Sequence, residues 1–300
     1  MIKKINEINA VFAGCARDCE QYVQKTLDNI NYYSILFKNS FNVIVENGSK
    51  DKTREILIKN KTHKNYYLFE DSLNKLKHRG QRLEKARNII IEKIKSTPIL
   101  SNCEILIILD LDSSGNYRIN KDDLHRAIDF LFSNESIAAV FANQLGTYYD
   151  MWTLRDNVYC KNDFWADILK CICQEVKPNE IISSEIFSKI KKDYVDKKTF
   201  SFAKDLAPIK VKSAFGGFGI YKMKYVLNNK RKYEGTQKII ISFKDKSEFQ
   251  IDYQRCEHVN FNLGFVDENL DLFILPYLIN REFMNVTFPP EAAIKLIIKD

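Results

Sequence analysis

The first half of the chain alternates short apolar segments with amphipathic segments of helical period, and this alternation restricts the fold more than any other feature of the sequence. The apolar segments, each the length of one buried strand, are Ala10–Gly14, Phe41–Val45, Tyr66–Phe69, Ile105–Leu109 and Ile137–Ala142. Repeated strand–helix units predict an α/β fold with a doubly wound, mostly parallel central sheet flanked by helices. Ligands of such sheets bind beyond the carboxyl ends of the strands.

Helical patterns fill the intervals between these strands. The predicted helices run from Val23 to Phe37, from near Lys52 with Asp51 as N-cap, over Arg82–Lys95, and from Asn120 to Phe132. In the third of them, Leu83, Ala86 and Ile90 share one face, as expected of a helix that packs on a sheet.

The pattern becomes less regular after Asn143. Phe164–Cys173 and Asn179–Lys192 have helical periodicity, and Ser213–Tyr221 is glycine-bearing and strand-like. With 10 Gly and 6 Pro, the chain is too poor in both for a long flexible linker. We therefore expect a single domain over residues 1–300, made of a regular half (1–142) and an irregular half (143–300).

Composition narrows the classes of ligand and compartment. The net charge of +7 suits an anionic small ligand, but the basic residues are mainly scattered lysines, so we do not expect a nucleic-acid partner. Seven cysteines, an odd number, indicate reduced thiols. No apolar run approaches the ~20 residues of a membrane span, so we expect a cytoplasmic protein. Peripheral contact with an anionic membrane through Lys189–Lys212 is a secondary hypothesis.

Two carboxylates follow the most apolar strand. Asp110 and Asp112 come directly after Ile105–Leu109, and they point to the same side if the strand continues. Carboxylates this close repel each other unless a cation joins them. Hard oxygen donors suit Mn²⁺ or Mg²⁺, with a nucleotide diphosphate completing the coordination shell. The spacing therefore predicts a divalent metal site.

Other interpretations of this pair stay open. An EF-hand loop is excluded, because its twelfth position would be Lys121 where a bidentate Glu is needed. A phosphatase or nucleotidyltransferase would also use an Asp-x-Asp metal site, and two solvated turn acids would need no ligand. No Walker-type motif is found, which argues against a P-loop enzyme. A non-catalytic glycan-binding protein is the alternative outside the enzymes.

A polar turn follows the second predicted strand. It runs from Glu46 to Thr53 and reads Glu-Asn-Gly-Ser-Lys-Asp-Lys-Thr. Gly48 permits a tight turn, and Ser49 or Asp51 can cap the helix that follows. Because a carboxylate at a strand end can bind ribose hydroxyls or a base edge, the turn is a candidate wall of a nucleotide pocket.

Two arginines have positions that need an explanation. Arg17 follows the first strand and precedes a helix, where it either holds a phosphate or pairs with Asp18. Arg87 falls between Leu83 and Ile94, inside the apolar arc of its helix. A charge at such a position needs a partner, which is either a donor phosphate or an acidic residue.

Together these motifs resemble a known class of enzyme. Glu-Asn-Gly-Ser-x-Asp-x-Thr with a downstream Asp-x-Asp is similar to the GT-A glycosyltransferases, which transfer a sugar from a nucleotide donor. Three further motifs resemble the fungal capsule-associated α-1,3-mannosyltransferase family: Tyr148-Tyr149-Asp150-Met-Trp152-Thr-Leu-Arg155, Ser213-Ala-Phe-Gly216-Gly217 and Cys256-Glu257-His258-Val-Asn-Phe-Asn262. The resemblance extends from about Ala10 to Asn262.

The resemblance implies a GT-A, Rossmann-like fold and a metal-dependent, retaining glycosyltransferase. Residues 1–142 would bind a GDP- or UDP-linked sugar, such as GDP-mannose. Residues 143–300 would bind a glycan, glycoprotein or glycolipid acceptor and complete the metal site. A late histidine is a common further metal ligand in these enzymes, so Mn²⁺ or Mg²⁺ would be held by Asp110, Asp112 and His258.

The same resemblance, with the residue patterns above, assigns the other site residues. Nucleotide-sugar contacts are expected from Gly14, Arg17, Glu46, Ser49, Asp51, Arg79, Arg82, Arg87, Asp110 and Leu111. Sugar or acceptor contacts are expected from Trp152, Arg155, Gly216 and Gly217, and catalytic roles from Glu257 and Asp150. Structural alternatives remain: Arg79 and Arg82 as solvated residues ahead of the helix, Trp152 in the core, Arg155 in a local ion pair, a bulged hairpin at the glycines, and Glu257 as a support for His258.

Overall fold

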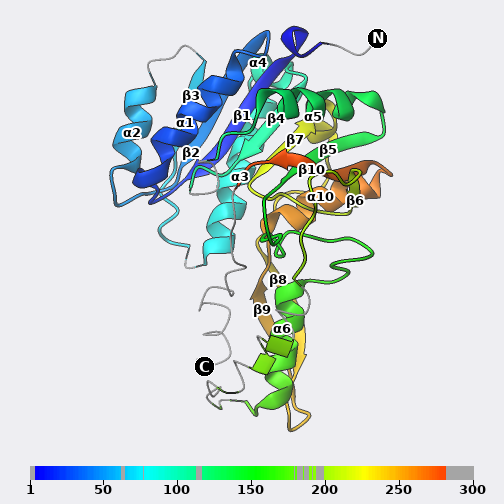
Figure 1. Cartoon of the computed structure of the whole chain (residues 1–300). Coiled ribbons are helices and arrows are strands. Elements are labelled where there is room, and N and C mark those ends of the chain that lie inside the picture. Colours follow the sequence, from blue (N-terminus) through cyan, green and yellow to red (C-terminus); the bar gives the residue numbers. More distant parts are fainter. Residues whose placement is uncertain are drawn as a thin grey trace.

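The computed structural model of the protein describes residues 4–61, 65–76, 78–112, 117–178, 180, 185, 189–190, 192–193 and 199–281. Its centre is an eight-stranded sheet in the order β3-β2-β1-β4-β7-β5-β10-β6 (Figure 1). Strands β1 to β5 and β10 share one direction, and β6 and β7 run the opposite way. The mostly parallel α/β sheet predicted from the sequence is thereby confirmed.

The sheet combines strands from both halves of the sequence. In chain order its strands are β1 (Asn9–Ala16), β2 (Asn39–Glu46), β3 (Tyr66–Glu70), β4 (Ile105–Leu109), β5 (Ile137–Asn143), β6 (Ile209–Val211), β7 (Phe218–Lys222) and β10 (Asp271–Ile279). The central position of β4 explains its composition, because every residue of Ile105–Leu109 is buried.

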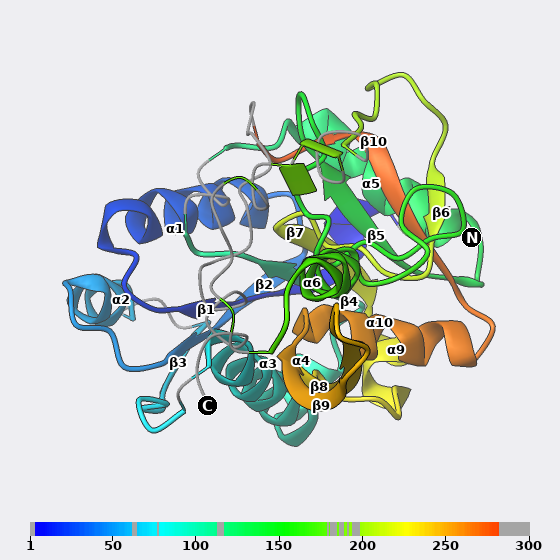
Figure 2. The same cartoon turned by 90° about the horizontal axis from the view of Figure 1, so that it is seen from below.

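Helices cover both faces of the sheet. They are η1 (Ile5–Glu7), α1 (Glu20–Ser34), α2 (Thr53–Asn60), α3 (Arg79–Ser96), α4 (Pro98–Ser101), α5 (Lys121–Ser133), α6 (Phe164–Glu175), α9 (Met223–Asn228) and α10 (Glu257–Asp267). Seen from below, α1 and α5 lie on one face and α3 and α10 on the other (Figure 2). The apolar residues of α1 and α5 join one core cluster, and those of α3 and α10 join a second.

A two-stranded hairpin stands apart from the main sheet. It consists of β8 (Thr236–Ser242) and β9 (Glu248–Gln254), and it projects with α6 beyond the lower edge of the sheet (Figure 1). Asp163 connects the two parts of this arm. Its carboxylate caps α6 by accepting from the backbone N–H of Ala166 and also accepts from the hydroxyl of Tyr253 at 2.8 Å.

Several element boundaries differ from the sequence-based expectation. Helix α1 ends at Ser34 rather than Phe37, and the strand expected over Ser213–Tyr221 begins only at Phe218. Helix α3 begins at Arg79, three residues early, and Gly80 in its first turn lies close to the hairpin side: a Cβ there would lie 2.7 Å from the carbonyl oxygen of Gly235. Such a tertiary contact leaves no trace in the helical period.

Three further expectations concern two helices and the absence of a membrane span. The helix expected over Asn179–Lys192 falls largely on residues that the structure does not describe. The cap expected at Asn120 is confirmed, since its side chain accepts from the backbone N–H of Asp122 at 2.8 Å. Within the described ranges, every helix is too short or too polar to cross a bilayer.

Candidate active site

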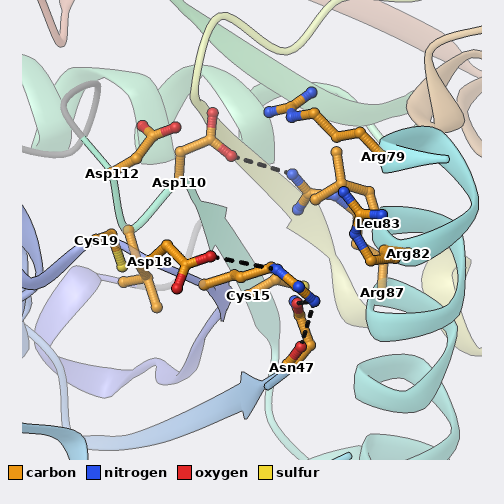
Figure 3. A pocket seen from close by; sticks show the side chains of 12 residues that line it. Cys15, Asp18, Cys19, Asn47, Arg79, Arg82, Leu83, Arg87, Asp110 and Asp112 are labelled. Carbon is orange, nitrogen blue, oxygen red and sulfur yellow. Dashed lines mark hydrogen bonds and ion pairs between the residues drawn. The ribbon is translucent and has the colours of Figure 1, made fainter. Parts of the chain in front are cut away.

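A cavity of about 230 Å³ lies at the carboxyl ends of β1, β2 and β4, between these strand ends and α3 (Figure 3). Its lining consists of Cys15, Arg17, Asp18, Cys19, Asn47, Arg79, Arg82, Leu83, Arg87, Asp110, Leu111 and Asp112. Seven of these were expected from the sequence as ligand or metal contacts: Arg17, Arg79, Arg82, Arg87, Asp110, Leu111 and Asp112.

The carboxylate pair stands at the end of the buried strand β4. The backbone N–H of Asp110 donates to the carbonyl of Gly217 at 3.1 Å, which fixes the chain where it leaves the sheet. Burial, and then the negative charge of Asp112, raise the pKa of Asp110 to about 6, although the charges of Arg87 and Arg79 act in the opposite direction. A divalent cation between the two carboxylates would relieve this repulsion.

Arg87 of α3 is buried, with 3% of its surface exposed, and its charge is shared between two carboxylates. Its Nε donates to Glu257 at 2.6 Å and one terminal nitrogen donates to Asp110 at 3.1 Å. Burial opposes the charge, but Glu257 and Asp110 hold the pKa of Arg87 well above its usual value. The other terminal nitrogen, Nη1, is buried without a hydrogen-bond partner among the residues described. Of the two expected partners, the acidic one is therefore present.

Glu257 and His258 are the first two residues of α10, and both are buried. The His258 ring stacks on Phe215 with a centroid separation of 3.9 Å. Burial, and then the charge of Arg87, hold the pKa of His258 well below its usual value, so the imidazole is neutral. Neither of its ring nitrogens has a hydrogen-bond partner in the described part of the chain.

The fit of these residues to a metal ion is uneven. Asp110 and Asp112 both line the cavity, and carboxylate oxygens are the donors that Mn²⁺ and Mg²⁺ prefer. His258 does not line the cavity, and the described residues contain no cluster of three or more His, Cys, Asp or Glu arranged to hold a metal. The carboxylate pair therefore fits a cation as it stands, whereas the role of His258 as third ligand stays a prediction.

The wall opposite the carboxylates is basic. Arg79 and Arg82 belong to the first turn of α3 rather than to a segment ahead of it, and Figure 3 shows both on this wall together with Leu83. Arg82 donates to the carbonyl of Leu76 at 2.8 Å. Burial lowers the pKa of Arg82, and the positive charges of Arg17 and Arg79 lower it further. An anion placed between them would be stabilised.

The side chains of the turn after β2 mostly form hydrogen bonds with nearby backbone N–H groups. The Glu46 carboxylate accepts from the N–H of Ser49 at 2.6 Å, and the Ser49 hydroxyl accepts from the N–H of Asp18 at 3.1 Å. The Asp51 carboxylate accepts from the N–H groups of Glu20 at 3.0 Å and Thr53 at 2.9 Å. None of the three side chains lines the cavity, so their contacts with a nucleotide remain predictions.

Of Gly14 and Leu111, both expected to contact the nucleotide sugar, Leu111 lines the cavity and Gly14 does not. A Cβ on Gly14 would lie 2.7 Å from the carbonyl oxygen of Leu109, so β1 and β4 approach closely only because this residue is glycine. Leu111 packs in the same place and is 1% exposed. Both residues therefore position the neighbouring carboxylates in the structure.

Two glycines connect the carboxylate pair to Asp150. Gly216 and Gly217 have φ values of 63° and 81°, which favour glycine. The N–H of Gly216 donates to the Asp150 carboxylate at 2.8 Å, while the carbonyl of Gly217 accepts from Asp110. Burial raises the pKa of Asp150, although bonds from Gly216 and Thr153 act to lower it.

The remaining residues expected at the acceptor side make structural contacts. Arg155 pairs with Asp163 and donates to the carbonyls of Trp152 at 3.0 Å and Leu154 at 2.7 Å, so the local ion pair is present. Trp152 is half-buried against the core. Contacts of Arg155 and Trp152 with a sugar remain predictions.

Sequence reasoning missed five residues of the cavity lining: Cys15, Asp18, Cys19, Asn47 and Leu83. Asn47 could have been found from the sequence, because it follows β2 inside the polar turn. The two cysteines carried no such signal. Burial raises the pKa of Cys15 to about 12 and that of Cys19 to about 11, so both remain neutral thiols.

Comparisons with known proteins give structural similarity alone. No protein-family model matches the chain, and no curated protein matches it. The resemblance to the fungal mannosyltransferase family therefore stays a prediction.

Several solved structures are similar to the structure of this chain. Mannosyltransferase PcManGT from Pyrobaculum calidifontis, in complex with GDP-Man and Mn²⁺, is 20% identical over 46% of this chain and 36% of its own, with a TM-score of 0.34. S. aureus TarS 1-349 with UDP-GlcNAc is 13% identical over 90% and 56%, with a TM-score of 0.46. Glucosyl-3-phosphoglycerate synthase from Mycobacterium tuberculosis, with Mn²⁺ and UDP-Glc, is 10% identical over 97% and 75%, with a TM-score of 0.41.

This chain thus spans 36% and 56% of the lengths of the first two proteins. All three identities are below 25% and all three TM-scores are below 0.5. The functional proposal below therefore rests on the residues of the cavity.

Proposed function

We propose that the protein is a metal-dependent glycosyltransferase of the GT-A type, which moves a sugar from a nucleotide-sugar donor to an acceptor hydroxyl. One observation carries this proposal: a pair of carboxylates, Asp110 and Asp112, and a pair of crowded arginines, Arg79 and Arg82, line the same cavity at the carboxyl ends of parallel strands. A diphosphate with a divalent cation matches both, since the cation binds the carboxylates and the phosphate oxygens bind the arginines.

The protein's own residues would prepare the leaving group. Asp110 is held by the carbonyl of Gly217 on its backbone and by Arg87 on its side chain, so its carboxylate is oriented before any ligand arrives. The Nη1 of Arg87 is a buried donor that has no hydrogen-bond partner among the residues that the structure describes. The metal, when bound, supplies positive charge that stabilises the departing nucleoside diphosphate.

Asp150 and Glu257 would divide the acceptor side between them. Glu257 is 2% exposed and engaged by Arg87, which favours a supporting role over that of a base. Asp150 is oriented by Gly216 and by the Thr153 hydroxyl at 2.8 Å. Asp150 is linked to Asp110 by two hydrogen bonds through the backbone of Gly216 and Gly217. This position suits a carboxylate that orients the sugar or the acceptor hydroxyl.

The finer assignments belong to the same proposal. Mannose from GDP-mannose, a glycan, glycoprotein or glycolipid acceptor, and retention of configuration are supported by the sequence resemblance. In a retaining transfer by front-face attack, the leaving phosphate assists the incoming hydroxyl, and no enzyme nucleophile is needed. His258 would then join Asp110 and Asp112 as the third ligand of Mn²⁺ or Mg²⁺, with its neutral imidazole as the donor.

A thermal-shift screen tests the proposed function. The protein would be heated with GDP, UDP and their sugars, each with and without Mn²⁺ or Mg²⁺. We expect at least one nucleoside diphosphate to raise the melting temperature, and more so with the metal. If no nucleotide stabilises the protein and phosphomonoesters are hydrolysed instead, the cavity belongs to a phosphatase and the proposal is wrong.

A further inference from the structure

Arg17, directly after β1, has a polar partner at each of its three guanidinium nitrogens. Its Nη1 donates to the backbone carbonyl of Asn47 at 2.8 Å and lies 3.4 Å from the side-chain oxygen of that residue. Its Nη2 donates to the side-chain oxygen of Asn74 at 2.8 Å, and its Nε lies 3.5 Å from the carboxylate of Asp18. Three loops, those after β1, β2 and β3, thus meet on one side chain.

These contacts limit what Arg17 can offer a ligand. All N–H bonds of a guanidinium lie in its plane, so these acceptors use most of the directions in which it would hold a phosphate. The two flat faces remain. The side chain is 24% exposed and lines the cavity, so Arg17 retains surface toward the ligand. A guanidinium face stacks well on an aromatic ring and poorly on a phosphate or a sugar hydroxyl.

The strand order of the sheet places the guanidinium of Arg17 relative to the carboxylate pair. Arg17 is tied to Asn47 and Asn74, on the β2–β3 side of β1, whereas Asp110 and Asp112 follow β4 on the other side. A nucleotide with its diphosphate at the carboxylates would therefore extend its base toward Arg17. Leu83, on the α3 wall, adds an apolar surface to the same cavity (Figure 3).

We propose that Arg17 recognises the donor by stacking its guanidinium face on the nucleobase, and that it makes no phosphate contact. This inference rests on the proposed function. It also changes the role expected of Arg17, from a charge for phosphate to a flat surface for a heterocycle. The Asn47 and Asn74 side chains then hold the plane in place and do not read the base themselves.

The variant Arg17→Lys tests this directly, because lysine keeps the charge and loses the plane. Affinities of GDP, UDP and inorganic pyrophosphate would be measured by calorimetry with Mn²⁺ present. We expect a loss of about 5- to 30-fold for the nucleotides that bind the parent protein, and an unchanged pyrophosphate affinity. Equal losses for nucleotide and pyrophosphate would make Arg17 a phosphate ligand, and unchanged nucleotide affinity would leave it without a role; either result overturns the inference.

A matched control separates stacking from loop bridging. Asn74→Ala removes the acceptor of Nη2 and leaves the guanidinium plane intact, so nucleotide affinity should stay within about twofold of the parent's. If Asn74→Ala weakens nucleotides as much as Arg17→Lys does, the loss comes from separation of the loops and the inference fails. Melting temperatures of both variants would show whether they fold. A parent protein that binds no nucleotide at all would instead overturn the proposed function, and the inference with it.

Discussion

The Nε of Arg87 lies 2.6 Å from Oε1 of Glu257, although 170 residues separate them in the chain. Both side chains are buried, at 3% and 2% exposure, and the same guanidinium reaches Asp110. The arginine therefore joins α3, α10 and the end of β4 at one point. Because this point forms one wall of the cavity, the stability of the fold and the geometry of the carboxylates depend on the same ion pair.

Glu257→Gln should destabilise the protein markedly. The amide can still accept a hydrogen bond from Arg87, but it leaves the buried guanidinium with only Asp110 to balance its charge. Removal of one partner of a buried ion pair costs about 3 to 5 kcal/mol, and urea denaturation would measure it. As a control, Glu268→Gln breaks an exposed pair with Lys230 and should leave the midpoint nearly unchanged. Equal effects of the two variants would contradict a structural role for Glu257.

Affinity for Mn²⁺ should rise with pH through about 6. The protonated Asp110 cannot bind a cation, and its pKa is raised to about 6 by burial and then by Asp112. Below this value each unit of pH should reduce the affinity by up to about tenfold, since one proton competes with the metal. Paramagnetic resonance of free Mn²⁺ between pH 5 and 8 would follow the change. His258 does not produce this step, because its pKa lies well below the usual value. A flat profile would remove Asp110 from the metal site.

Gly216→Ala should damage both stability and activity. The new Cβ would lie 2.6 Å from the carbonyl oxygen of Ala142, at a φ of +63°. The positive φ alone costs about 1 to 3 kcal/mol, and the backbone clash adds to it. Gly48→Ala is the matched control, because its φ is +86° but the Cβ would meet only the side chain of Asn74 at 3.1 Å. Unfolding midpoints of the two variants should differ clearly. If they coincide, the close approach at Gly216 does not exist.

Asp112→Asn should abolish metal-dependent nucleotide binding and leave the fold intact. Asp112 is exposed, so we expect the neutral amide to leave the packing of the core unchanged. Calorimetry with a nucleoside diphosphate should show the same affinity with and without Mn²⁺ in this variant, but not in the parent. Asp122→Asn, at an exposed acidic position at the start of α5, is the control for a general loss of negative charge. An intact metal effect in Asp112→Asn would contradict the assignment.

The sequence was sufficient for the first five strands of the sheet, because their identity depends on local pattern, but it did not predict β6 or β10. The fully apolar Ile105–Leu109 could only be a central strand, and the residues after it had to lie at the ligand edge. Start and end points were less predictable wherever tertiary contacts decide them. The first turn of helix α3, for example, lies against Gly235 through Gly80, a contact between residues remote in sequence.

The candidate site was predictable where the position of a single residue required a partner of opposite charge. Arg87 stood inside an apolar arc and required a partner, either a phosphate or an acidic residue, and the structure supplies the carboxylates of Glu257 and Asp110. The identity of Glu257 as that partner depends on how α10 packs on α3, which no local pattern encodes. The polar turn around Glu46 was predicted both to support the next helix and to contact a nucleotide. Its carboxylates do accept from backbone N–H groups in the structure, and the nucleotide contact stays a prediction.

Anomalous diffraction at the manganese edge tests the central claim most directly. Crystals would be soaked with Mn²⁺ and a nucleoside diphosphate that raises the melting temperature. The account predicts one strong peak within bonding distance of the Asp110 or Asp112 carboxylate and of the phosphate oxygens, with the phosphates facing Arg79 and Arg82. A bound nucleotide whose manganese lies elsewhere, with both carboxylates free of metal and phosphate, would contradict it.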